Sequence, residues 1–195
     1  GTITLNSKQR DSFEDGNVTD SWQETMSDDA NGFAAVQTDS YDGSFSAYDD
    51  VSGNANGPQS MVEHTFGSEI TENTQFTFRL RTDSGDDCQR HGGTVRLTDT
   101  DSGQWIGLGQ TGRGTNAFDV FRWNQGSSEL GGCGGSTFWK FTFKAFPDEN
   151  VTEVTADGNT RNETIESDFD KVSIVSRGTG ASNPGEVWVD LVPLE

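Results

Sequence analysis

The chain of 195 residues is poor in features that most globular domains share. Only 30% of its residues are hydrophobic and only four are proline, whereas ordinary domains are close to half apolar. No apolar run approaches the roughly 20 residues of a membrane-spanning helix, so we expect no direct insertion into a membrane. The apolar content is concentrated in 13 Phe and 5 Trp side chains. A few large aromatics must therefore form the core of a single domain.

Positive charge is the second shortage. Lys and Arg total 13 against 32 Asp and Glu, only four of the cations are Lys, and the net charge is −19. This balance disfavours nucleic acid as a partner, because counterion release needs a basic surface. The composition is similar to that of proteins from extreme halophiles, archaea among them, in which concentrated salt screens the repulsion between acids. We therefore expect a halophilic protein.

Cysteine is scarce as well. The two cysteines, Cys88 and Cys133, lie in Gly-rich segments, and an even number in such loops predicts one disulfide and an oxidising, extracellular setting. Two free thiols or a pair of metal ligands are the alternatives. Three glycosylation sequons begin at Asn17, Asn150 and Asn162, and they agree with a secreted glycoprotein.

Hydrophobic residues recur with a period of two almost everywhere, and no segment has the 3.6-residue period of a helix. Asp-Gly and Ser-Gly pairs separate the alternating segments and predict turns. More than ten short strands separated by turns predict an all-β fold, a two-sheet antiparallel jelly-roll sandwich with no substantial helix. The predicted strands are 33–36, 44–48, 61–66, 76–81, 94–97, 105–108, 118–123, 138–146, 151–155, 171–176 and 186–192.

Two segments at the ends of the chain carry a family resemblance. Residues 11–22 contain Phe-Glu-Asp-Gly, and residues 186–192 read Glu-Val-Trp-Val-Asp-Leu-Val. Together with residues 40–48, 95–108 and 137–143, they resemble the strands of the concanavalin A-like and laminin-G-like jelly rolls of secreted haloarchaeal or haloarchaeal-virus proteins. The resemblance covers residues 11–195 and implies one jelly-roll domain whose first and last strands meet. Residues 1–10 precede this domain.

The same resemblance implies a structural Ca²⁺ site. Jelly rolls of this kind often hold the ion where the first and last strands meet, and carboxylate oxygens are suitable ligands for it. The donors in this chain would be Glu14 or Asp15 together with Asp190. No organic cofactor is expected.

Glycan recognition would need exposed aromatic side chains that stack on sugar rings beside polar groups. Trp105, Trp123 and Trp139 are the candidates, with packing in the core as the alternative for each of them. Phe138 and Trp139 are adjacent, so in a strand they point to opposite faces. One of these two side chains therefore faces away from the core that the other one fills.

The chain lacks the acidic motif of a glycoside hydrolase with this fold. That motif, Glu-x-Asp-x-x-Glu, places the catalytic carboxylates on one face of a strand. The nearest run, Glu163-Thr-Ile-Glu166, has its acids three residues apart, on opposite faces, and we expect both to be solvated surface acids. No serine-hydrolase elbow, zinc-protease motif or phosphate loop is present either. We therefore expect that the chain is not an enzyme, and glycoside hydrolysis is the third hypothesis.

Residues 1–10 contain a short alternating segment, Thr2-Ile-Thr-Leu-Asn6. It predicts a strand that completes either its own sheet or the open sheet edge of a neighbouring copy, where Ile3 and Leu5 would fill pockets. Strand donation of this kind is head-to-tail, so it builds filaments or layers rather than closed dimers.

Two functions follow from these observations. In the first, the chain is a structural or adhesive subunit of a halophile cell-surface filament, layer or virion, and its partners are copies of itself or other surface proteins. In the second, it is a carbohydrate-binding module of a secreted protein, and its partner is a glycan. Both place the chain outside the cell, on a cell surface or a virion.

Overall fold

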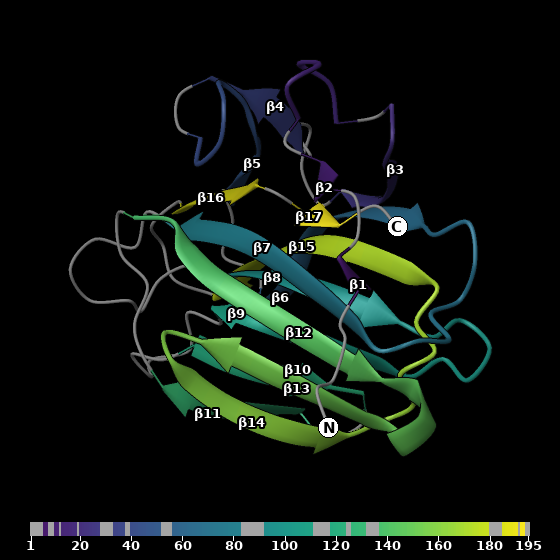
Figure 1. The fold of residues 1–195 in the computed structure, drawn as a ribbon. Helices are drawn as coiled ribbons and strands as arrows, with labels where there is room; N and C mark the ends of the chain where they lie inside the picture. The colour runs from purple at the N-terminus through teal and green to yellow at the C-terminus, as the bar shows by residue number, and fades with distance from the viewer. Residues whose placement is uncertain are drawn as a thin grey trace.

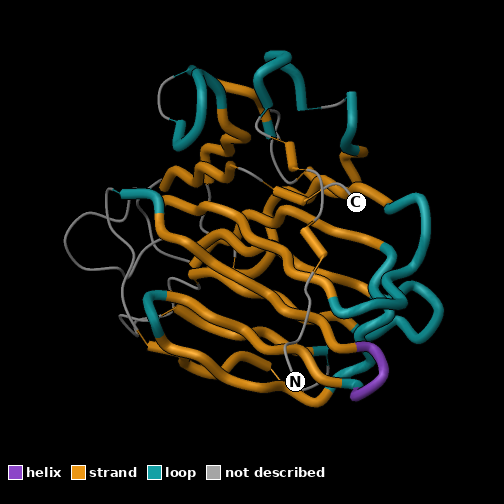
Figure 2. Tube along the Cα trace, viewed as in Figure 1, coloured by secondary structure: helices purple, strands orange, loops and turns teal. Residues whose placement is uncertain are grey.

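The computed structural model describes thirteen stretches of the chain. They are residues 6–7, 10–11, 13–18, 20–27, 33–37, 40–51, 56–82, 92–110, 118–123, 126–131, 137–179, 185–190 and 192–193. Figure 1 shows two large β-sheets, one in front of the other, and Figure 2 shows that strands dominate the described trace. The predicted all-β, antiparallel jelly-roll sandwich is confirmed. Within the described residues no helix is long and apolar enough to cross a membrane.

The front sheet in Figure 1 has eight strands and the sheet behind it has seven. The eight-stranded sheet runs in the order β14 (Asn159–Thr164), β13 (Val151–Ala156), β12 (Trp139–Phe146), β7 (Thr74–Thr82), β16 (Gly185–Asp190), β5 (Ser46–Val51) and β4 (Ala34–Val36), and β1 (Asn6–Ser7) also pairs with β7. The seven-stranded sheet runs β11 (Gly126–Gly131), β10 (Phe118–Arg122), β9 (Trp105–Gln110), β8 (Gly92–Thr98), β15 (Lys171–Thr179), β6 (Asn56–Thr65) and β3 (Gln23–Ser27). A small third sheet pairs β17 (Val192–Pro193) with β2 (Arg10–Asp11), and one helical turn, η2 (Pro147–Glu149), follows β12.

The core between the sheets is aromatic, as the composition predicts. Phe78 on β7 stacks on Phe141 of β12 with the ring centroids 5.0 Å apart, and Phe118 of β10 meets Phe141 edge-on at 4.9 Å. All three side chains are fully buried. Because successive strand residues alternate between faces, burial of these rings turns the residues between them toward the outer face of the sheet. The core therefore determines which side chains of β7 and β12 face outward.

A buried ion pair joins the two sheets where their edge strands β11 and β14 meet. Arg122 donates to Glu163 at 2.8 Å, and Arg161 donates to the Ser128 hydroxyl at 2.6 Å. The expectation that Glu163 is a solvated acid is wrong, because only 5% of it is exposed. Its carboxylate faces into the end of the sandwich, where Arg122 compensates for the lost hydration. The expectation for Glu166 is correct, since that residue is exposed.

Residues 11–22 differ from the predicted first strand. Phe13 has φ of 60° and Gly16 has φ of 76°, and the Gly16 N–H donates to the Phe13 carbonyl at 2.9 Å. The segment is therefore a turn-rich loop, and the next strand, β3, begins at Gln23. Turn-forming Asp, Gly and Asn residues interrupt the alternation, yet Phe13 and Trp22 are still buried in the core. The two ends of the chain do meet, because Val192 of β17 pairs with Asp11 of β2.

The described part of residues 1–10, here called the leader, lies along its own domain. Asn6 and Ser7 run parallel to β7 beside Thr74 and Gln75, and β16 pairs with β7 further along, from residue 79 to residue 82. The predicted pocket-filling residues Ile3 and Leu5 lie outside the described residues. Exchange of the leader with a neighbouring copy, and the division at residue 10, stay predictions.

Candidate functional site

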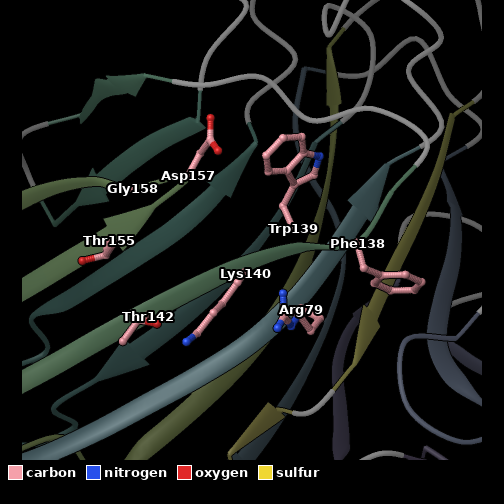
Figure 3. Close-up of a pocket in the computed structure, with 8 residues that line it drawn as sticks. All are labelled: Arg79, Phe138, Trp139, Lys140, Thr142, Thr155, Asp157 and Gly158. Carbon is pink, nitrogen blue, oxygen red and sulfur yellow. The ribbon is translucent and has the colours of Figure 1, made fainter.

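The outer face of the eight-stranded sheet carries a cavity of about 320 Å³. Most of its walls are side chains from β7, β12 and β13, together with the β13–β14 turn (Figure 3). A cavity built on paired strands holds its lining groups in fixed positions, which is typical of preformed ligand sites. The lining residues are Arg79, Phe138, Trp139, Lys140, Thr142, Thr155, Asp157 and Gly158.

Two cations face this cavity from neighbouring strands. Arg79 of β7 and Lys140 of β12 are directly opposite one another in the antiparallel pairing. Like charges in this arrangement are destabilising, so the placement needs a compensating interaction. In Figure 3 both charged groups lie on the same side of β12, whereas the Asp157 carboxylate points away from them. We call Arg79 and Lys140 the cation pair.

The guanidinium of Arg79 rests on an aromatic ring. Its central carbon lies 4.0 Å from the centroid of the Tyr41 ring, a distance at which cation–π attraction is significant. The buried Arg79 Nε has no hydrogen-bond partner. Lys140 is exposed and forms no ion pair with any described residue. The cation pair therefore retains unused hydrogen-bond donors at the cavity.

Tyr41 belongs to a loop, residues 40–45, that two carboxylates anchor. Oδ2 of Asp190 accepts hydrogen bonds from the Tyr41 and Asp42 N–H groups, both at 2.9 Å. Oε1 of Glu14 accepts from the Ser44 and Phe45 N–H groups, both at 2.7 Å. Asp190 is fully buried, and it lies on β16 opposite Arg79. The loop is thus fastened at both ends, and its first anchored residue supports the arginine.

The predicted calcium donors take part in these loop contacts. Glu14 and Asp190 direct carboxylate oxygens at backbone N–H groups of one loop, whereas Asp15 is exposed and accepts from the Asn17 N–H at 3.0 Å. Among the described residues, no three His, Cys, Asp or Glu side chains gather as a metal site would require. The calcium site stays a prediction.

More aromatic rings continue this face beyond the cavity. Phe138 meets Tyr41 edge-on with the centroids 6.1 Å apart, and 48% of Tyr41 is exposed. Further along, the Arg81 guanidinium lies 4.6 Å from the Trp188 ring, which contacts Tyr48 at 5.3 Å. Trp188 is only 5% exposed, so Tyr41 is the exposed ring of this group, and an exposed ring next to polar side chains provides the contacts that a sugar needs.

The three predicted tryptophan platforms are not brought together. Trp139 lines the cavity but packs inward on Phe118 with the centroids 5.5 Å apart. Trp105 lies on the seven-stranded sheet with Arg96 4.3 Å above its ring, and Trp123, 43% exposed, follows β10 on that same sheet. The prediction that Phe138 and Trp139 face opposite ways is consistent with their contacts. Phe138 is therefore the outward-facing member of that pair.

The described sequons differ in accessibility. Asn17 is half-buried and its amide donates to Asp20 at 2.7 Å. Asn150 is exposed in a left-handed turn after η2, and Asn162 is exposed on β14. The predicted disulfide partners, Cys88 and Cys133, lie outside the described residues. Glycosylation and the disulfide stay predictions.

A second cavity of about 330 Å³ lies beside β6. His64 there contacts the Ser21 carbonyl oxygen at 2.6 Å, and Lys171 pairs with Glu63 at 3.5 Å. Its lysine, unlike the cation pair, thus has an acidic partner within the same cavity. We therefore take the cavity beside the cation pair as the candidate site.

Three of the site residues, Tyr41, Arg79 and Lys140, are absent from the sequence predictions. The available signal is the run Phe76-Thr-Phe-Arg-Leu-Arg81, which places two arginines on one face of a strand in a chain with only 13 cations. Lys140 follows in a second strand of the same pattern. Sequence alone does not show that these two strands are neighbours, since 60 residues separate Arg79 from Lys140.

Comparison with known proteins identifies the fold. No protein-family model and no curated protein matches the sequence. Among solved structures, the chain is similar to the cellulose-induced protein Cip1, with a TM-score of 0.67 and 13% identity over 94% of each chain. It is also similar to a Bacillus licheniformis β-glucanase, with a TM-score of 0.60 and 13% identity over 97% of this chain and 99% of the other. A third similar structure is the carbohydrate-binding module CBM66 from Bacillus subtilis, with a TM-score of 0.53 and 11% identity over 97% and 98%.

The prediction that the chain is not an enzyme is contradicted by this group of structures. Besides the glucanase, it includes a Crh5 transglycosylase at 10% identity and a bacteriophage carbohydrate esterase at 12% identity. The prediction was wrong because it relied on missing sequence motifs, chiefly the Glu-x-Asp-x-x-Glu run. Absence of that motif excludes one arrangement of carboxylates, whereas catalytic groups can also come from several different strands. The fold is shared by enzymes and by carbohydrate-binding modules.

Proposed function

We propose that this domain binds carbohydrate on the outer face of its eight-stranded sheet, at the cavity beside the cation pair. The observation that carries the proposal is the convergence there of the exposed Tyr41 ring and the half-buried Phe138 ring with the polar groups of Arg79, Lys140 and Thr142. The similar structures include a carbohydrate-binding module and a glucanase, which supports this class of ligand. The chemistry fits as well, since sugar rings stack on aromatic faces while their hydroxyls bond to polar side chains.

Alanine substitutions at the two aromatic residues test the location of the site. We expect Tyr41→Ala and Phe138→Ala each to weaken binding of a retained polysaccharide by about tenfold, as truncation of a central aromatic contact commonly does. The measurement is affinity electrophoresis in gels that contain soluble polysaccharides, with thermal melts to confirm folding.

Trp123→Ala provides the comparison on the other sheet. Trp123 is 43% exposed there, and we expect its removal to leave the migration shift unchanged. Loss of binding in this variant, with Tyr41→Ala and Phe138→Ala unaffected, would move the site to the seven-stranded sheet and refute the proposed location.

The assembly function is the second candidate. It depends on Ile3 and Leu5, which lie outside the described residues, and on the position of Asn6 and Ser7 along β7. An extracellular location on a halophile cell or virion agrees with the net charge of −19 and the sequons. These points stay predictions, and carbohydrate binding is the better supported function.

A further inference from the structure

We propose that the ligand at this site is an anionic glycan, whose carboxylate or sulfate group is held by Arg79 and Lys140. This inference rests on the proposed carbohydrate binding and adds the chemical class of the sugar. Arg guanidinium groups bind carboxylate and sulfate-like oxygens through two parallel hydrogen bonds, and a neighbouring Lys adds a point charge.

The ion pairs of this chain are unevenly distributed among its cations. Acids outnumber cations 32 to 13 in this chain, so an acidic partner is in principle available for every cation. Arg122, Lys144 and Lys171 each have such a partner within 3.5 Å. In the described part of the chain, Arg79 and Lys140 have none. Two adjacent cations without an acidic partner are unexpected in so acidic a chain, and a bound anion would relieve their mutual repulsion.

Two nearby acids do not fill this role. Asp190 lies opposite Arg79 on β16, but it is fully buried and its Oδ2 accepts the loop N–H groups of Tyr41 and Asp42. Arg79 forms no ion pair with it. Asp157 lies at the rim, and in Figure 3 its carboxylate points away from the cation pair.

The Arg79 side chain is already held in position. Asp190 fixes the Tyr41 backbone, and the Tyr41 ring supports the Arg79 guanidinium at 4.0 Å. A long side chain held in this way loses little conformational entropy on binding, which increases affinity.

The net negative charge of the protein excludes non-specific adsorption to polyanions as an explanation of binding. A protein of net charge −19 is repelled by polyanions at long range, so it has no general tendency to adsorb to them. Retention on a polyanion must therefore come from a local cationic site. At 0.15 M salt the screening length is about 8 Å, which weakens the long-range repulsion more than direct contacts at the site.

Two matched ligand pairs provide the experiment. The full chain is run by affinity electrophoresis against polygalacturonate and its fully methyl-esterified form, and against dextran sulfate and dextran. We expect retention by at least one of the anionic members and at least tenfold weaker retention by its neutral counterpart. Retention by polygalacturonate identifies a carboxylate ligand, retention by dextran sulfate identifies a sulfate ligand, and either result supports the proposal.

Charge-removing variants connect retention to the site. We expect Arg79→Gln and Lys140→Gln each to weaken binding of the anionic glycan about tenfold or more, because charge-assisted hydrogen bonds are lost. Lys171→Gln makes the same change in net charge on the other sheet, where Lys171 pairs with Glu63, and it should leave binding unchanged. Thermal melts show whether each variant is folded.

The failures can be told apart. Equal binding of the neutral and anionic members would overturn the anionic class and leave carbohydrate binding intact. Binding of an anionic glycan that is insensitive to Arg79→Gln and Lys140→Gln would overturn the assignment to this cavity. Absence of binding to all four ligands and to a wider panel of neutral polysaccharides would overturn both proposals.

Discussion

The outer faces of the two sheets share one contact, an arginine over an aromatic ring, in different electrostatic surroundings. On the eight-stranded sheet Arg79 lies 4.0 Å from the Tyr41 ring, and on the seven-stranded sheet Arg96 lies 4.3 Å from the Trp105 ring. The row of residues that contains Arg96 continues through Ser173 to Glu63, an acid. The row that contains Arg79 runs from Asp190, a fully buried acid, through Arg79 to Lys140, a second cation.

The charges beside the two arginines distinguish a contact that only stabilises the fold from one that is available to a ligand. Glu63 accepts a hydrogen bond from the Ser173 hydroxyl at 3.1 Å and pairs with Lys171 at 3.5 Å. The row of cross-strand neighbours that contains Arg96 therefore also contains an acid, Glu63, on the outer face of the seven-stranded sheet. On the other face Asp190 is buried and accepts loop N–H groups, and the Asp157 carboxylate points away from the cation pair (Figure 3). The charge of the cation pair, which forms no ion pair with any described residue, is what supports the proposed binding surface.

Removal of the main acid from each face should produce the largest difference between them. We expect Asp190→Ala to lower the free energy of unfolding by about 2–4 kcal/mol, because two loop N–H groups lose their buried acceptor. We expect Glu63→Ala to cost at most about 1 kcal/mol, since its ion pair with Lys171 is partly solvated. Urea unfolding measures both. Equal losses would show that the two acids have the same structural role.

A carboxylate beside the seven-stranded face should show a pH-dependent effect of intermediate size. Burial raises the pKa of Asp99, but hydrogen bonds from Ser102 and from the Asp101 N–H outweigh it, so this pKa lies below its ordinary value of 3.8. Ionised Asp99 therefore stabilises the fold fully above its unfolded pKa, and this contribution disappears as the pH falls through its folded pKa.

The matching variant is Asp99→Ala. We expect a loss of about 1–2 kcal/mol near neutral pH from the missing hydrogen bonds, with a clearly smaller gap between variant and wild type at about pH 2. Denaturant titrations at both pH values provide the measurement, and glycan retention at neutral pH should be unchanged. A gap that stays constant or grows as the pH falls would contradict the lowered pKa.

The smallest effect is expected from Gly107, which leaves room for the arginine contact of the seven-stranded face. A Cβ at this position would lie 3.1 Å from the Arg96 Cγ and 3.5 Å from the Phe121 Cβ. We expect Gly107→Ala to displace Arg96 and cost about 1 kcal/mol, with no change in glycan binding. Gly67→Ala, where nothing lies within 4 Å, is the stability control. Loss of glycan retention in Gly107→Ala would show that the two faces are coupled.

The fold could be predicted where strands bury one face only. The run 76–81 alternates between core and surface, and β7 spans Thr74–Thr82. The strand β14 was missed because its residues are polar on both faces, and its inward-facing Glu163 is stabilised by Arg122 of the other sheet. Residues 11–22 were predicted as the first strand from their resemblance to a jelly-roll family, but the turn residues between Phe13 and Trp22 make the described part of this segment a loop.

The site was harder to predict because its parts are distant in sequence. Tyr41, Arg79 and Lys140 come from a loop and two strands, and only the pairing of β7 with β12 and the carboxylate of Asp190 bring them together. Trp105, Trp123 and Trp139 were predicted as sugar-stacking residues because large aromatic side chains stand out in a polar sequence. The more informative signal was the rare positive charge.

The loop between β4 and β5 separates recognition from folding. Asp190 and Glu14 hold it through backbone N–H groups, so the side chains at positions 41 and 42 take no part in either anchor. Gly43 has φ of 67°, and a Cβ there would lie 2.3 Å from the Glu14 carboxyl carbon, so this position must remain glycine. If the proposed site binds sugar, we expect that evolution or an engineer can replace Tyr41 and Asp42 to change which sugar is selected, while Glu14, Gly43 and Asp190 keep the loop in place.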